Sequence, residues 1–432
     1  MAGDGVICLN GISQASWTVP SHTSMLTGLY PSFHHINQYP GDKTKYRFSS
    51  DSNITLAQIL SRNGYLTKAF TGSLCVSAGS FGKGFDSFDE SFYMINDTNS
   101  GKLWKWLKNH RERKFFLFLH TYEVHAPYTR DIFVNYKRQK PDNKKSLKNV
   151  INLINERNFV NQPMTSEMHE ESGVNLFRNV LIRTGNYDKE TIETFYDGGI
   201  KHTDTFIGDL IGKIKELGLE RNTLIVFTSD HGDEFEDHSK YSRYNAHAHS
   251  LYEELIHVPI IFYLPSKLPK GKQVEIPTQV VDIVPTVLEL LGIDRKEYRF
   301  NGESLLSNFS ADSKQKERIV FSEATSGEEK KSLRGNSFKY IYTISDKERN
   351  AKGGERTLVP SKVKSQELYD LFNDPDEKNN LAGTEPRLCN TFKNKINDIM
   401  KKALKSIPKN YRYVDEKDQT HKNALKALGY IQ

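Results

Sequence analysis

Helix-like and strand-like segments alternate along most of this chain, and that order constrains the fold more than any other feature. Helix-like stretches precede short strand-like runs that are mostly apolar, as at 54–64 before 65–70, 102–110 before 114–120, and 198–217 before 223–229. A further apolar run at 258–263 is followed by a helix-like stretch at 281–291. Continuously apolar strands are typical of parallel sheets covered on both faces. The sequence therefore predicts an α/β fold with a mixed, mostly parallel sheet and helices on both faces.

The pattern changes beyond residue 300, where the composition becomes more polar. Short strands at 333–342 and 367–371 predict a small antiparallel sheet, followed by a helical tail that ends at 425–431. We therefore expect a catalytic domain over 1–300 and a smaller C-terminal subdomain over 301–432. Residues 129–190 are rich in Lys, Asn, Arg and Glu and are interpreted as an insertion. It is either a helical cover for the active-site edge or a solvated decoration without a role.

Composition excludes several classes of partner. The 432 residues carry 60 basic and 54 acidic side chains, a net charge of +6. That surplus is too weak for a nucleic-acid-binding protein and supports only a mild attraction to anionic substrates.

No apolar run approaches the length of a membrane span, and no signal peptide precedes the first strand, so the location as written is cytoplasmic. The three cysteines do not suggest a disulfide framework, and the oligomeric state stays open.

The stretch Thr18-Val-Pro-Ser-His22 carries the first candidate for chemistry. Pro20 suits a first helical turn, where its missing N–H has no consequence. A helix start binds anions because its N–H groups are unpaired and its dipole is positive there. Ser21 and His22 add polar groups for substrate binding, and the Thr18 hydroxyl beside them is a candidate nucleophile for a sulfate or phosphate ester. The alternative is a Ser/Thr-rich helix cap without catalytic function.

The second candidate is the pair Asp230 and His231, which follows the apolar run at 223–229. Ligands of open α/β sheets bind beyond the carboxyl ends of the strands. A carboxylate beside an imidazole suits Zn²⁺, Mn²⁺ or another divalent ion. The pair is therefore a candidate metal site, unless Asp230 only caps a turn at the strand end.

These segments resemble the sulfatase family of the alkaline phosphatase superfamily. Thr18 to His22, with Leu26-Thr27-Gly28, are similar to the signature Cys/Ser-x-Pro-Ser-Arg followed by Leu-Thr-Gly. Ser229 to Gly232 resemble the family's metal motif, and further matches extend from residue 3 to residue 431. The resemblance implies an alkaline-phosphatase-like sheet and an ester hydrolase that uses a divalent metal, with Mn, Zn or Ca as candidates.

The resemblance also assigns roles to histidines. His125, in His125-Ala-Pro-Tyr128, matches a His-x-Pro-Tyr segment whose histidine faces the anion. His247 precedes Ser250-Leu-Tyr-Glu-Glu254 at the place of a histidine that grips ester oxygens or protonates the leaving group, and His249 is the second choice, for substrate binding. Without the resemblance, the last two are equally a pair of loop histidines.

Two departures change the expected chemistry. Thr18 stands where sulfatases carry the Cys or Ser that is oxidised to formylglycine, so no formylglycine is expected, and His22 stands where an Arg is usual. An unmodified Thr is similar to the phosphate- and phosphonate-handling branches, which favours these esters over sulfates. The expected substrate is a small anionic ester or a sulfated or phosphorylated glycan or lipid. The alternatives are a phospho-group transferase and an inactive homologue that acts as a binding protein.

The N-terminus departs from the family as well. Ala2 to Val6 match the end of the helix that follows the family's first metal-binding strand. We therefore expect a missing βα unit of about 30 residues, and with it the loss of one or two carboxylate ligands. A start codon placed too late, a fragment, and a degenerate protein are the possible explanations.

Overall fold

The computed structural model describes residues 1–36, 53–126, 128, 130, 132, 189–235, 237–238, 247–310, 317–325, 328–344 and 363–406. The chain divides into two compact units. The first comprises the described residues of Met1–Leu56, Arg221–His238 and Ala246–Asp415, and the second those of Ala57–Glu220. The predicted insertion at 129–190, apart from its ends, and the predicted tail at 425–431 lie outside the described residues. The predicted boundary at residue 300 stays a prediction.

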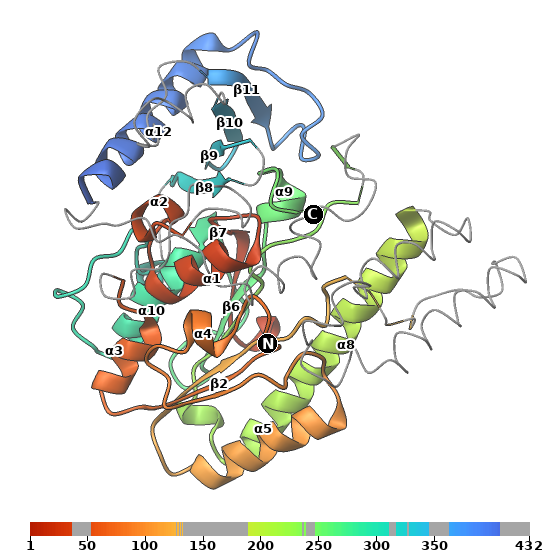
Figure 1. The fold of residues 1–432 in the computed structure, drawn as a ribbon, viewed down its shortest axis with the longest axis vertical. Coiled ribbons are helices and arrows are strands. Elements are labelled where there is room, and N and C mark those ends of the chain that lie inside the picture. The colour runs from red at the N-terminus through yellow and green to blue at the C-terminus, as the bar shows by residue number, and fades with distance from the viewer. Residues whose placement is uncertain are drawn as a thin grey trace, which may run out of the picture. The chain divides into compact units, whose positions relative to one another are not determined.

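Four strands form the central sheet of the first unit, in the order β5 (Ile225–Thr228), β6 (Ile260–Tyr263), β1 (Val6–Ile12) and β7 (Lys272–Gln279). Figure 1 labels β6 and β7 of this sheet. β1 is parallel to β7 and antiparallel to β6, and β5 is antiparallel to β6. Three strands therefore run in one direction and β6 in the other. Val6, Cys8 and Ile12 are buried at alternate positions of β1, as expected for side chains on one face of a strand.

Helix α1 (Thr18–Thr27) follows β1 and begins at the predicted helix start. It ends at Gly28, whose φ of 70° lies in the left-handed region that glycine tolerates. A Cβ on Gly28 would lie 2.8 Å from the Phe300 ring, so the close packing also requires glycine. Up to residue 310, the other helices of this unit are α2 (Pro31–His34), α9 (Glu253–Ile256), α10 (Ile283–Leu290), and the short turns η1 (Ala2–Asp4), η4 (Val280–Asp282) and η5 (Leu306–Asn308).

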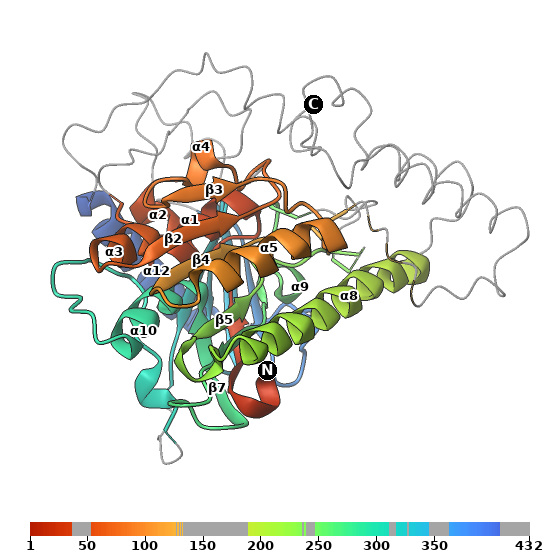
Figure 2. The same ribbon diagram turned by 90° about the horizontal axis from the view of Figure 1, so that it is seen from below.

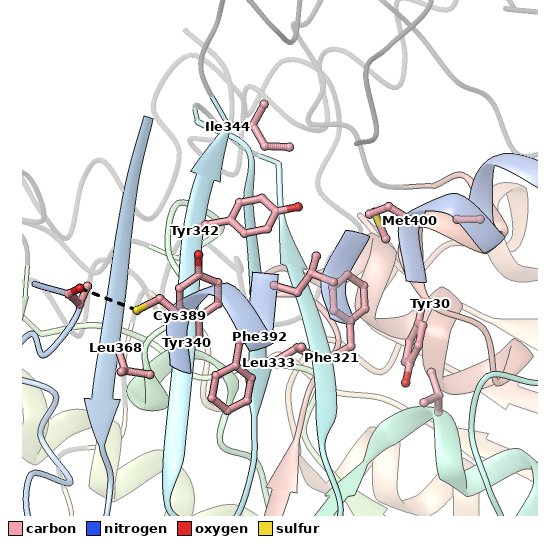
Figure 3. Close-up of a cluster of buried hydrophobic side chains, with 14 residues drawn as sticks. Tyr30, Phe321, Leu333, Tyr340, Tyr342, Ile344, Leu368, Cys389, Phe392 and Met400 are labelled. Atoms are coloured by element: carbon pink, nitrogen blue, oxygen red, sulfur yellow. Dashed lines mark hydrogen bonds between the residues drawn. The ribbon is translucent and has the colours of Figure 1, made fainter. Parts of the chain in front are cut away.

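A separate antiparallel sheet follows, in the order β11 (Val363–Asp370), β10 (Phe338–Ile344), β9 (Lys330–Arg334) and β8 (Val320–Ala324). Helix α12 (Pro386–Ser406) packs across it. Figure 3 shows the apolar cluster between helix and sheet, in which the rings of Tyr340 and Phe392 stack with centroids 6.0 Å apart. Tyr30, beyond α1, joins the same cluster through Phe321, at 5.2 Å. The predicted small C-terminal antiparallel sheet with a helix is confirmed.

The second unit holds a parallel sheet of β3 (Ser87–Asp89), β2 (Leu66–Phe70) and β4 (Phe115–Leu119). Trp106 of α5 packs edge-on against Phe70 and Phe115, with ring centroids 6.5 and 5.4 Å apart, so α5 lies against this sheet (Figure 2). The helices of the unit are α3 (Leu56–Arg62), α4 (Ala78–Phe81), α5 (Asp97–His110), α8 (Lys189–Glu216) and the short η3 (Glu220–Asn222). No described helix is both long and apolar enough to span a bilayer.

Candidate metal-assisted active site

The start of α1 presents the candidate nucleophile. Thr18 is the first residue of the helix and is almost completely buried. Its Oγ1 lies 3.4 Å from His231 Nε2, beyond the end of β5. Because Trp17 provides no side-chain cap, the first N–H groups of α1 have no bond from a capping side chain. The structure therefore brings Thr18 and His231, two residues predicted for the site, close together.

Asp230 and His231 follow β5, as predicted. The Asp230 carboxylate lies 3.4 Å from His231 Nε2 and 3.5 Å from His22 Nδ1. Ser21 Oγ donates to the Asp230 backbone carbonyl at 2.7 Å, which joins the turn after β5 to α1. His231 Nδ1 lies 2.7 Å from the Gly232 carbonyl, a pairing that places the proton on Nδ1. The other ring nitrogen, Nε2, then faces Thr18 Oγ1 and the Asp230 carboxylate.

His22 differs from the arginine that the family usually carries at this place. Burial lowers the pKa of His22, and the Asp230 carboxylate opposes that shift without reversing it. Its Nδ1 donates to the Thr18 carbonyl at 2.9 Å. His22 is therefore neutral near pH 7, and it braces the first turn of α1 instead of supplying a positive charge.

Three side chains of the first unit form a group that can hold a metal ion. One ligand atom each from His231, Asp233 and His247 lies within 4.8 Å of the others. The His247 Nδ1 to Asp233 Oδ1 distance is 2.9 Å, and the two imidazole rings are 4.5 Å apart. Two imidazoles with a carboxylate suit Zn²⁺ or Mn²⁺, whereas Ca²⁺ prefers oxygen ligands. The bond from His231 Nδ1 to the Gly232 carbonyl fixes the orientation of the ring, as such bonds do for histidine ligands of metal ions.

Asp233 is a site residue that sequence reasoning missed. It lies in the acidic run after Asp230, where no local feature separates it from its acidic neighbours. His249, the second-choice histidine, turns to another member of that run, with its Nε2 2.9 Å from the buried Glu234 carboxylate. His247 and His249 therefore pair with two consecutive carboxylates, and only His247 belongs to the metal group.

His125 lies in the second unit, after β4. Its Nδ1 donates to the Ala126 carbonyl at 2.6 Å, and its ring meets Tyr122 edge-on at 5.4 Å. These contacts hold the ring in a defined orientation. The role predicted for His125, facing the substrate anion, stays a prediction, as do the substrate-binding roles of Ser21, His22 and His249.

The fold belongs to a known class of α/β proteins, as two solved structures show. A solved structure in complex with its substrate D-glucosamine-2-N,6-O-disulfate has a TM-score of 0.67 and 18% identity, covering 96% of this chain and 93% of that chain. A phosphonate monoester hydrolase from Silicibacter pomeroyi has a TM-score of 0.62 and 16% identity, covering 94% and 89%. Both likenesses show the fold.

Residues 1–293 match the sulfatase family model, and the chain belongs to the sulfatase family. Bovine (Bos taurus) arylsulfatase K is 28% identical over 246 residues, which are 54% of this chain and 42% of the relative. The chain therefore spans less than half the length of this curated relative in the match. The family resemblance inferred from the sequence is confirmed, and the family is generally dependent on a divalent metal.

Proposed function

We propose that the protein is a metal-assisted hydrolase of anionic esters, with Thr18 as nucleophile and with phosphate or phosphonate esters preferred over sulfates. The observation that carries the proposal is the 3.4 Å distance between Thr18 Oγ1 and His231 Nε2, at a helix start beside the candidate metal group. Membership of the sulfatase family supports ester hydrolysis.

Each site residue has a proposed role in the reaction. Thr18 Oγ bonds to phosphorus or sulfur while the leaving-group oxygen departs in line. His231, Asp233 and His247, with Asp230 beside them, would hold the cation, which supplies a Lewis acid that favours the ionised form of a nearby hydroxyl. The N–H groups of the first turn of α1 stabilise charge on the non-bridging oxygens. His125 is proposed to help there, whereas His247, predicted for the same role, would instead be engaged by Asp233 and the cation. Water then cleaves the Thr18 ester to release the anion.

Threonine decides between the possible esters. A formylglycine diol expels sulfate by collapsing to its aldehyde, and Thr18 has no such route because its oxygen cannot form a carbonyl. Release from Thr18 therefore requires attack of water on the bound ester. That requirement favours phosphorus, which water attacks in the second step of phosphate and phosphonate hydrolysis. The substrate is proposed to be a small anionic ester or a phosphorylated or sulfated glycan or lipid.

The test compares four substrates on the full chain with Zn²⁺ or Mn²⁺: an aryl sulfate, a phosphate monoester, a phosphodiester and a phosphonate monoester. We expect faster turnover of at least one phosphorus ester than of the aryl sulfate, and loss of all turnover in Thr18→Val. Turnover of the aryl sulfate alone would overturn the preference. Full activity of Thr18→Val would overturn the nucleophile. Product transfer to added glycerol would indicate a transferase.

A further inference from the structure

The turn His247-Ala248-His249 has a backbone conformation that an L-residue avoids. Ala248 is buried, with a φ of 75° in the left-handed region. A non-glycine residue there costs about 1–2 kcal/mol, so neighbouring contacts must hold it. In this conformation the two histidines on either side of Ala248 reach different carboxylates: His247 contacts Asp233 and His249 contacts Glu234.

Two contacts hold the turn from opposite ends. The Ala248 N–H donates to the Ser16 carbonyl at 2.7 Å, two residues before Thr18. The His249 carbonyl accepts from Lys330 Nζ at 2.8 Å. The first contact ties the turn to the entry of α1. The second ties it to the C-terminal antiparallel sheet, because Lys330 is the first residue of β9.

The same sheet also borders the entry of α1 directly. The Glu323 N–H of β8 donates to the Gln14 carbonyl at 2.9 Å, and Ser322 Oγ donates to the Ser13 carbonyl at 2.6 Å. Residue Ala324 of β8 pairs with Lys330 across the sheet. Adjacent strands therefore contact the segment before Thr18 and the turn that carries His247. A charged donor on a neutral carbonyl is stronger than an ordinary hydrogen bond, and burial limits its competition with water.

We propose that Lys330 is a positioning residue: its bond to the His249 carbonyl holds the left-handed Ala248 turn and thereby keeps His247 in the metal group with His231 and Asp233. This inference rests on the proposed metal site. It gives the C-terminal sheet a role in the chemistry of a site whose other described groups come from α1, the turn after β5 and the turn before α9. Lys330 itself does not need to touch substrate or metal.

The test measures Zn²⁺ affinity of the chelator-stripped full chain by calorimetry, and kcat and KM in parallel. Lys330→Met should bind Zn²⁺ about 10- to 100-fold more weakly, the range for loss of an outer contact to a metal ligand. Its kcat should fall at saturating substrate with KM nearly unchanged. Lys401→Met is the matched control. Lys401 lies on α12 with its exposed ammonium 3.3 Å from Asp398, and the variant should bind Zn²⁺ as the parent does.

Two further variants separate positioning from mere packing. Lys330→Arg keeps a charged donor for the His249 carbonyl. Its Zn²⁺ affinity should therefore stay within about threefold of the parent's. Ala248→Gly removes the left-handed penalty, so adding it to Lys330→Met should recover about fivefold or more of the lost affinity. Absence of that recovery would contradict the proposal.

The outcomes distinguish this inference from the proposed function. Unchanged Zn²⁺ affinity in Lys330→Met overturns the positioning role and leaves the hydrolase intact. Weakened binding in a chain that hydrolyses none of the four esters supports positioning and overturns the hydrolase. Lys330→Gln is measured beside Lys330→Met, and unfolding of both would show that Lys330 is structural, which overturns the proposal. Absence of Zn²⁺ binding in the parent overturns it as well.

Discussion

Two buried regions of the first unit are filled in opposite ways. The cluster between α12 and the C-terminal sheet is apolar and aromatic (Figure 3). Around the start of α1, by contrast, many of the buried side chains are polar, although Trp17 is buried there as well. The polar ones are hydroxyls, an amide and an imidazole, from Ser13, Gln14, Ser16, Thr18, Ser21, His22, Thr23 and Ser24. Burying apolar surface stabilises a fold, whereas buried polar groups are roughly neutral at best and costly when unpaired. The apolar region is therefore expected to determine stability, and the polar region to determine activity.

The largest effect is expected from the polar region. Thr18→Val keeps the size of the side chain and removes the proposed nucleophile, so turnover should fall by about 10⁴-fold or more, about 5 kcal/mol of transition-state stabilisation. The melting temperature should change little, because the contact of Thr18 Oγ1 with His231 is a long one, 3.4 Å. Thr27→Val, at the other end of α1, is the control and should keep its activity. A comparable loss in both variants would show that helix damage, and not the nucleophile, explains the result.

The second-largest effect is expected from a substitution in the apolar region. Phe392→Ala removes a buried ring that stacks on Tyr340, and should lower the free energy of unfolding by about 3–5 kcal/mol. Turnover per folded molecule should be unchanged. Phe372→Ala is the matched control because Phe372 is 83% exposed, and it should fall within about 0.5 kcal/mol of the parent. Urea denaturation measures the free energy of unfolding of both variants. A lower kcat in folded Phe392→Ala would show that the apolar region also affects activity.

A smaller effect is expected at the metal group. His247→Ala removes one of three proposed ligands and should weaken Zn²⁺ binding by about 100-fold, about 2.7 kcal/mol. Chelation of the parent should abolish turnover and lower its stability, because an ion that binds only the folded state stabilises it. His257→Ala alters an exposed histidine bonded to the Leu9 carbonyl and serves as the control. Equal Zn²⁺ affinity in the two variants would remove His247 from the group.

The smallest effect is the pH dependence of the polar region. Burial lowers the pKa of His34 from 6.5 to about 3. Between these values the unfolded chain binds a proton that the folded chain does not, so stability falls as the pH falls below 6.5. The contribution is about 2 kcal/mol at pH 5.

His34→Gln tests that contribution, since the amide retains donor and acceptor groups near Ser24 Oγ, which lies 3.1 Å from His34 Nε2. Urea denaturation at pH 7.5 and at pH 5 should show a smaller loss of stability in the variant than in the parent. The difference between the two losses isolates His34 from the neighbouring His35, whose pKa burial also lowers, to about 4. Equal losses would show that His34 does not titrate in this way.

Much of the fold follows from local signals. The apolar runs at 114–120 and 223–229 predicted β4 and β5, and the Thr18–Pro20 stretch predicted the start of α1. Each of these depends on short-range sterics and on the periodicity of burial, which a sequence displays directly. The sequence likewise placed Asp230 and His231 beyond a strand end, and the structure brings them to Thr18 and His22.

The missed residues depend on contacts between distant segments. Asp233 is selected from an acidic run only because His247 reaches it from 14 residues further along the chain. Lys330 contacts His249 across 81 residues, through a sheet whose position no local pattern predicts. Lysine at the start of a strand is otherwise read as a surface side chain.

By itself, the sequence determined the class of fold, the family, and the hydroxyl that stands where a formylglycine precursor is usual. Those conclusions rest on residue identity and on spacing along the chain. Only the tertiary structure decided which carboxylate of the acidic run joins His231 and His247, and that burial keeps His22 neutral where the family carries arginine. The reason is physical: proton affinity and metal geometry depend on solvent exclusion and on side chains from distant segments, and both exist only after the strands have paired.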